Sequence, residues 1–150
     1  MIPLSDGKVV VVTVPINNSV DSTAFTTVEI DAVGFDYCTI VGHLGATDGP
    51  MTVWKVQESD TSGSGMTDVT GLVASGSTGD GRLPQATDDG LLFGFRFPLI
   101  GRKRYIDVVA TTGDVTTGTI LGVIAILQRA KQAPDTTAEK GFSGLLTLPA

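Results

Sequence analysis

Apolar and polar residues alternate along most of the chain with a period of two, which is the spacing of a β-strand with one buried side. β-Branched residues fill many of the apolar positions, and this favours strands over helices. The pattern predicts seven or eight strands, at residues 8–14, 24–32, 36–44, 51–58, 67–74, 91–97, 104–111 and 119–128. Pro15 is expected to end the first strand, and Thr26–Thr27 to mark a bulge in the second.

The alternation also predicts which side chains point inward. In residues 36–44 apolar side chains stand on both sides, which is typical of a central strand covered on both faces. In residues 51–58 we expect Trp54 and Val56 to point into the core. The strand at residues 91–97 places four apolar side chains on one side: Leu91, Phe93, Phe95 and Phe97.

Short strands separated by turn segments predict an all-β fold. We expect one antiparallel β-sandwich or jelly-roll-like domain over residues 1–130. No strand–helix alternation is visible, which argues against a doubly wound fold. Two loops stand out, at residues 59–65 and 75–90, and the second is long enough to suggest a binding role.

Residues 131–150 differ from the rest and are predicted to form an extended C-terminal arm. One helical turn is expected at residues 136–140, capped by Thr136 or Thr137 and closed by Gly141. The apolar residues that follow have two interpretations. They form a final edge strand packed on their own domain, or an arm that docks on a neighbouring subunit.

Composition adds a constraint on partners. The chain has 150 residues, a net charge of −6 and 17% charged residues, below the roughly 25% of ordinary soluble domains. Its mean hydropathy of +0.24 indicates either a large core or an apolar surface that partners cover. The acidic balance argues against binding nucleic acid, and no apolar run approaches the roughly 20 residues of a membrane span. The one basic cluster, Arg102–Arg104, is predicted to be a solvated strand end or an ion-pair patch.

The search for catalytic or metal-binding residues finds no candidate set. His43 is the only histidine, no GxSxG motif is present, and we expect a partly buried structural histidine in a strand. Cys38 is the only cysteine, which excludes an internal disulfide and a CxxC zinc site, and it is expected to be buried. Loop aspartates lack the spacing of a calcium loop and are predicted to be turn residues: Asp60, Asp68, Asp80, Asp88 and Asp89. The chain is therefore expected to be no enzyme, with no cofactor and no metal.

Several stretches carry a resemblance to a known group of proteins. They are IDxxGFDYCTI at residues 30–40, KVQESD at 55–60 with DVTG at 68–71, RYIDVV at 104–109 with TTGT at 116–119, and APxTTAExG at 133–141. Together they resemble small structural proteins of tailed bacteriophages and prophages that are encoded near capsid genes. The resemblance implies a virion protein, most like the capsid decoration or cement proteins. Such proteins lie on the outer capsid surface, often as trimers, and reinforce contacts between major capsid subunits.

On this basis we expect a virion protein that binds the major capsid protein and forms a homo-oligomer, a trimer by preference. The residues expected to contact other subunits or the capsid lie at the two ends: Met1, Ile2, Leu4, Phe142, Leu145, Leu146 and Leu148. Two alternatives stay open. One is another phage tail or head–tail connector protein. The other is a carbohydrate-binding β-sandwich module that uses the loop at residues 75–90.

Overall fold

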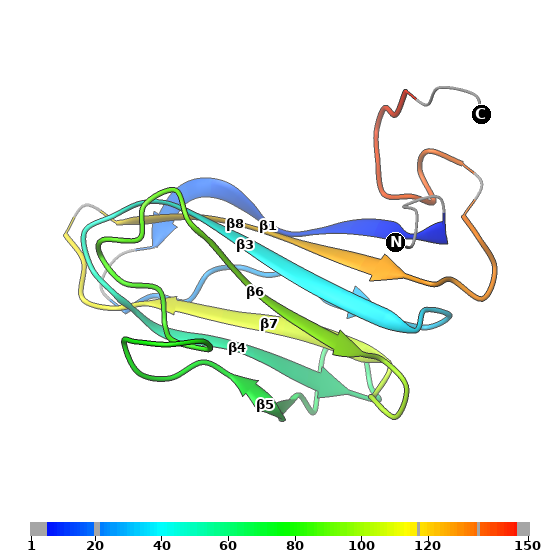
Figure 1. The fold of residues 1–150 in the computed structure, drawn as a ribbon, viewed down its shortest axis with the longest axis horizontal. Helices are drawn as coiled ribbons and strands as arrows, with labels where there is room; N and C mark the ends of the chain where they lie inside the picture. Colours follow the sequence, from blue (N-terminus) through cyan, green and yellow to red (C-terminus); the bar gives the residue numbers. More distant parts are fainter. Residues whose placement is uncertain (1–5, 20–21, 117, 135, 147–150) are drawn as a thin grey trace.

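The computed structural model describes residues 6–19, 22–116, 118–134 and 136–146, without the side chains of residues 16–19. Two antiparallel sheets of four strands each pack together, as Figure 1 shows. The strands are β1 (Lys8–Ser19), β2 (Ile30–Asp31), β3 (Tyr37–Thr47), β4 (Met51–Ser59), β5 (Thr67–Val73), β6 (Leu92–Pro98), β7 (Tyr105–Thr112) and β8 (Thr119–Gln128). In the described part of the chain no helix is long and apolar enough to cross a membrane.

The order of the strands is that of a jelly roll. Sheet A has the order β1-β8-β3-β6, and sheet B has the order β2-β7-β4-β5. Every connection except the one from β4 to β5 passes from one sheet to the other, which is how two Greek keys form a double-sheet jelly roll. The predicted all-β, jelly-roll-like sandwich is therefore confirmed.

The core lies between the sheets and is built from the alternating apolar positions. Trp54 on β4 stacks on Phe95 on β6 across the sandwich, with 5.3 Å between ring centroids. Trp54 and Val56 are both buried, as predicted. Full burial of an apolar side chain of this kind stabilises a fold by about 1.5–3 kcal/mol, so these positions hold the two sheets together.

Two strand predictions are wrong near the N-terminus. β1 does not end at Pro15 but continues to Ser19, with register shifts against β8 on both sides of the proline. This is possible because β1 lies at the edge of sheet A, where a missing N–H is tolerated.

The predicted strand at residues 24–32 shrinks to β2 at its far end and a single bridge from Ala24 to Thr111. Its backbone passes between the sheets. The Phe25 N–H donates to Ala110 in sheet B, and the Val28 N–H donates to Val12 in sheet A, each at 2.8 Å. A segment that binds both sheets in turn cannot form one continuous ladder.

β3 is central in sheet A, as predicted, but it is not covered on both faces. The inward side chains of Cys38, Ile40 and Leu44 are fully buried. The opposite side is only half-buried, and His43 on that side is exposed. The expectation of a partly buried histidine is therefore wrong, because no element of the described chain packs over the outer side of this strand.

Candidate binding surfaces

The C-terminal arm is attached to the sandwich through its first half. After β8 the Ala130 N–H donates to the carbonyl of Asp6 (3.0 Å), and the Lys131 N–H donates to the carbonyl of Gly34 (2.8 Å). Pro134 is buried. These contacts tie the start of the arm to the loops beside β1 and β3.

The middle of the arm forms the predicted single helical turn. Thr136 and Glu139 make a capping box: the Thr136 hydroxyl accepts from the Glu139 N–H (3.2 Å), and the Glu139 carboxylate accepts from the Thr136 N–H (3.0 Å). Gly141 ends the turn with a φ of +87°, a conformation that side chains disfavour. The turn lies against the edge of β1, where the Val9 N–H donates to the Lys140 carbonyl at 2.8 Å.

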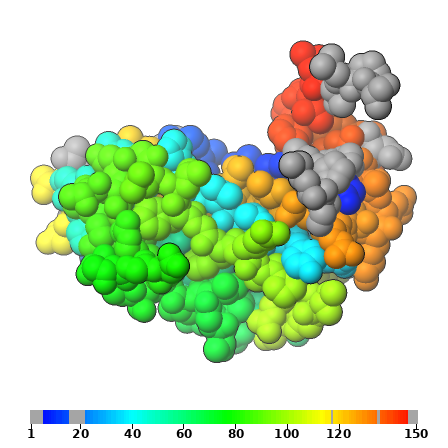
Figure 2. Space-filling view, viewed as in Figure 1, coloured from blue at the N-terminus to red at the C-terminus, as the bar shows by residue number. Residues whose placement is uncertain are grey.

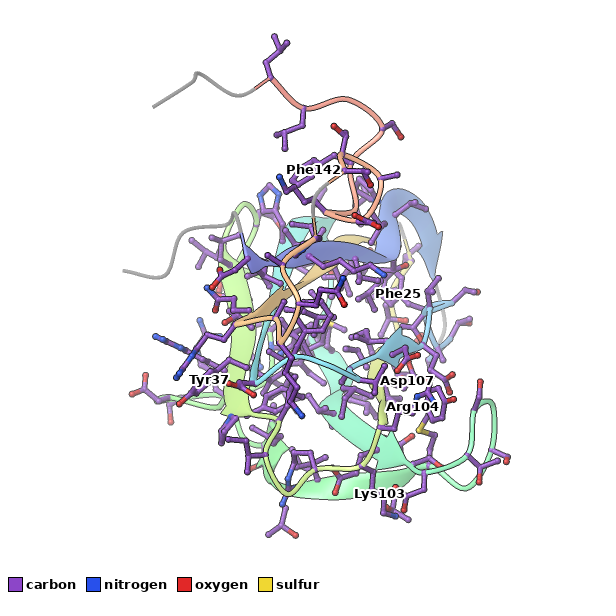
Figure 3. All side chains as sticks on the ribbon, turned by 90° about the vertical axis from the view of Figure 1, so that its right-hand side faces the viewer. Phe25, Tyr37, Lys103, Arg104, Asp107 and Phe142 are labelled. Atoms are coloured by element: carbon purple, nitrogen blue, oxygen red, sulfur yellow. The ribbon has the colours of Figure 1, made fainter. Side chains whose placement is uncertain are left out.

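The end of the arm is apolar and projects from the molecule, as Figure 2 shows for the orange-to-red segment. Phe142 is half-buried at the base of the arm above β1 (Figure 3). Leu145 is exposed, and the exposed fraction of Leu146 is 102%. The described residues of the arm, 131–134 and 136–146, contain no strand, so the interpretation as a final edge strand is wrong. Docking on a neighbouring subunit stays a prediction, and Met1, Ile2, Leu4 and Leu148 lie outside the described residues.

The loop at residues 75–90 is organised by an ion pair. The Arg82 guanidinium donates to both carboxylate oxygens of buried Asp88, and the Gln85 N–H donates to the same carboxylate at 2.7 Å. The hydrogen bonds from Arg82 lower the pKa of Asp88 below its ordinary value. Arg82 also lies over the ring of Phe93, 5.0 Å from its centroid. Sequence reasoning missed this cluster, because an arginine and an aspartate six positions apart in a glycine-rich loop give no recognisable motif.

A small cavity lies between this loop and β6. Its volume is about 270 Å³, and its lining residues include Trp54, Asp80, Arg82, Phe93 and Phe95. Ligand pockets are commonly about 300–1,000 Å³, so this one suits only a small polar group such as a single sugar unit.

The basic cluster Arg102–Arg104 forms the predicted ion-pair patch, at the end of the sandwich labelled in Figure 3. Arg102 pairs with Glu58 at 3.4 Å, and Arg104 donates twice to Asp31, at 3.0 and 2.7 Å. Asp31 accordingly has a lowered pKa, with the hydrogen bonds from Arg104 as the largest cause. Charges used in this way are satisfied within the chain and are not free to bind phosphate groups.

The residues considered for chemistry are placed apart or held in structural contacts. Cys38 is fully buried, and burial raises its pKa to about 12, so its thiol is inert at neutral pH. Asp68 accepts from Lys55 and Gln57, and Asp89 accepts from the Thr47 N–H. Among the described residues no group of three or more His, Cys, Asp or Glu side chains is positioned to hold a metal ion.

Comparisons of the chain with protein-family models, with curated proteins and with solved structures find no match. The structure thus defines the class of protein by topology alone, as an eight-stranded jelly roll with a C-terminal arm.

Proposed function

We propose that this protein is a structural virion protein that decorates a phage capsid and stabilises it by bridging major capsid subunits. It acts on the outer capsid surface as a homo-oligomer, a trimer by preference, and performs no chemistry. The observation that carries the proposal is the apolar end of the arm, where Leu146 is wholly exposed although the arm's first half is firmly attached. An apolar segment presented in this way fits a protein that works by clamping onto neighbours.

Three further features support the proposal. The sequence resembles small phage structural proteins over stretches that lie in β2–β3, β4–β5, β7 and the turn of the arm. Jelly rolls recur in viral capsid domains, although a fold alone never establishes a function. The net charge of −6 suits an outer surface, because an acidic protein is not attracted to packaged DNA.

The test is to measure the copy number of this chain in purified virions of the phage or prophage that encodes it, by quantitative mass spectrometry. A decoration protein is expected at a copy number close to that of the major capsid protein. Added to shells that lack it, the purified chain should sediment with them to saturation. A handful of copies per virion would indicate a tail or connector protein instead, and absence from virions would refute both.

A second function, carbohydrate binding, is favoured by the cavity beside the loop at residues 75–90. Arg82 and Asp80 supply polar groups and Phe93 an aromatic ring in one place, which is the chemistry that sugar hydroxyls and ring faces require. Glycan-array binding that is lost in Arg82→Ala would support this function. A blank array would exclude it for the sugars tested.

A further inference from the structure

Charged side chains are distributed unequally between the two sheets. The four strands of sheet A contain no aspartate or glutamate, and their only lysine or arginine residues are Lys8 and Arg96. Every strand of sheet B carries at least one carboxylate. Those on the outer side of sheet B are paired, as in Lys55–Asp68 (2.8 Å) and Thr27–Asp107 (3.0 Å). Sheet B is therefore built to face water, and sheet A is not.

The side of sheet A that points away from the core is apolar across its full width. We call this surface the outer face of sheet A. One cross-strand row runs through all four strands, and it consists of Val11, Ile124, Val41 and Gly94. The next row consists of Val9, Ile126, Thr39 and Arg96. The exposed fractions of Val11 and Leu92, near opposite edges of this face, are 52% and 66%.

The outer face of sheet A also has a hollow. It lies over β3 and β6, has a volume of about 270 Å³, and is lined by residues that include Val41, Leu92 and Gly94. The hollow is mostly apolar and open to solvent, so an apolar side chain from another molecule can enter it without displacing any described element. A leucine is a side chain of suitable size and character.

We propose that the outer face of sheet A binds a second copy of this chain, and that the arm of one copy lies on the face of the other with a leucine in the hollow. Charge favours this occupant. Each copy carries a net charge of −6, so two copies repel except where they meet through a surface free of carboxylates. The outer face of sheet A is such a surface, and residues 142–146 of the arm (FSGLL) are uncharged as well.

The position of the arm favours the same arrangement. Its turn is held at the edge of β1, which is also the border of the outer face of sheet A, and its leucines point into solvent. Each copy therefore presents an apolar face and an uncovered apolar segment that suits it. A head-to-tail contact of this kind closes into a ring when the rotation permits, which fits a trimer. The inference rests on the self-association in the proposed function and not on capsid binding.

The test is the mass of the full chain in solution, measured by light scattering without capsids, for the wild type and four variants. Val11→Lys and Leu92→Lys place a charge on the outer face of sheet A. Leu145→Ser/Leu146→Ser removes the apolar end of the arm. Val73→Lys is the matched control, because Val73 is 48% exposed against 52% for Val11 and lies on β5, the edge strand of sheet B.

The wild type is expected to be a stable oligomer, and the two face variants and the arm variant are expected to self-associate at least tenfold more weakly. Val73→Lys should keep the wild-type mass. Circular dichroism confirms that each variant folds, and if Val11→Lys does not fold, Leu92→Lys decides. A wild type that stays monomeric, or an oligomer that survives both face variants, would overturn the proposal, and an oligomer that survives only the arm variant would overturn the role of the arm. A monomeric wild type that still coats shells would leave the capsid function standing, so the two failures are distinguishable.

Discussion

Deletion of residues 135–150 tests how far the arm belongs to the fold. The cut falls after the hydrogen bonds of Ala130 and Lys131 and after buried Pro134, so the firmest attachments of the arm remain. What is lost is the bond between the Val9 N–H and Lys140 (2.8 Å), together with the partial burial of Phe142. The truncated chain should therefore keep the jelly roll.

The size of the loss follows from these two contacts. A backbone hydrogen bond contributes about 0.5–1.5 kcal/mol net, and the Val9 N–H returns to water rather than being left buried. Half-burial of a phenylalanine contributes about 1 kcal/mol, as half of the value for full burial. The free energy of unfolding should fall by about 1–3 kcal/mol. For a domain of this size that corresponds to a fall in Tm of about 2–12 °C.

The assay is thermal and urea unfolding followed by circular dichroism, together with light scattering and sedimentation with capsid shells. The truncated chain should unfold cooperatively but lose both self-association and shell binding. Leu145→Ser/Leu146→Ser is the control, since substitution of such exposed side chains should change the free energy of unfolding by no more than about 0.5 kcal/mol. Loss of the cooperative transition, or normal shell binding by the truncated chain, would refute this account of the arm.

Three further predictions concern the sandwich itself. Cys38, with its pKa near 12, should react with a thiol reagent at pH 8 at least about 100-fold more slowly in the folded than in the denatured protein, and equal rates would show that it is accessible. Gly42→Ala places a Cβ 2.8 Å from the Trp54 ring and should lower the free energy of unfolding by about 1–3 kcal/mol in urea titrations, but by less in a Trp54→Phe background; equal costs in both would exclude this clash. Asp88 has a folded pKa below its ordinary 3.8, so the stability that its pairing with Arg82 provides is complete above that value and is lost as the pH falls through the folded pKa. Asp88→Asn should therefore make unfolding curves between pH 5 and pH 2 less pH-dependent, and an unchanged slope would contradict this assignment.

The alternation of side chains was enough to predict the sandwich because most strands here have one side in the core. The inward positions of β4 and β7 follow directly from that period, and so do the bounds of β8. The failures occur where backbone pairing, not side-chain burial, decides. Pro15 lies within a strand because that strand is at an edge, and the segment around Phe25 and Val28 divides its hydrogen bonds between two sheets.

The candidate surfaces were harder to predict for a related reason. The arm's turn was predictable, since Thr136, Glu139 and Gly141 are local signals that act within six residues. The outer face of sheet A was not, because it is assembled from strands far apart in the sequence. Val11, Ile124 and Val41 become one row only once the order of the strands is known.

The strand order also explains the unusual composition. A mean hydropathy of +0.24 with 17% charged residues would suggest a chain poor in charge everywhere, yet sheet B is laced with ion pairs. Because the deficit of charge falls on sheet A, it marks one surface and not the whole molecule. A substitution that adds a charge should therefore matter for assembly on sheet A and be tolerated on sheet B, as the pair Val11→Lys and Val73→Lys is designed to measure. If both were tolerated equally, the apolar surface of sheet A would have no role in assembly.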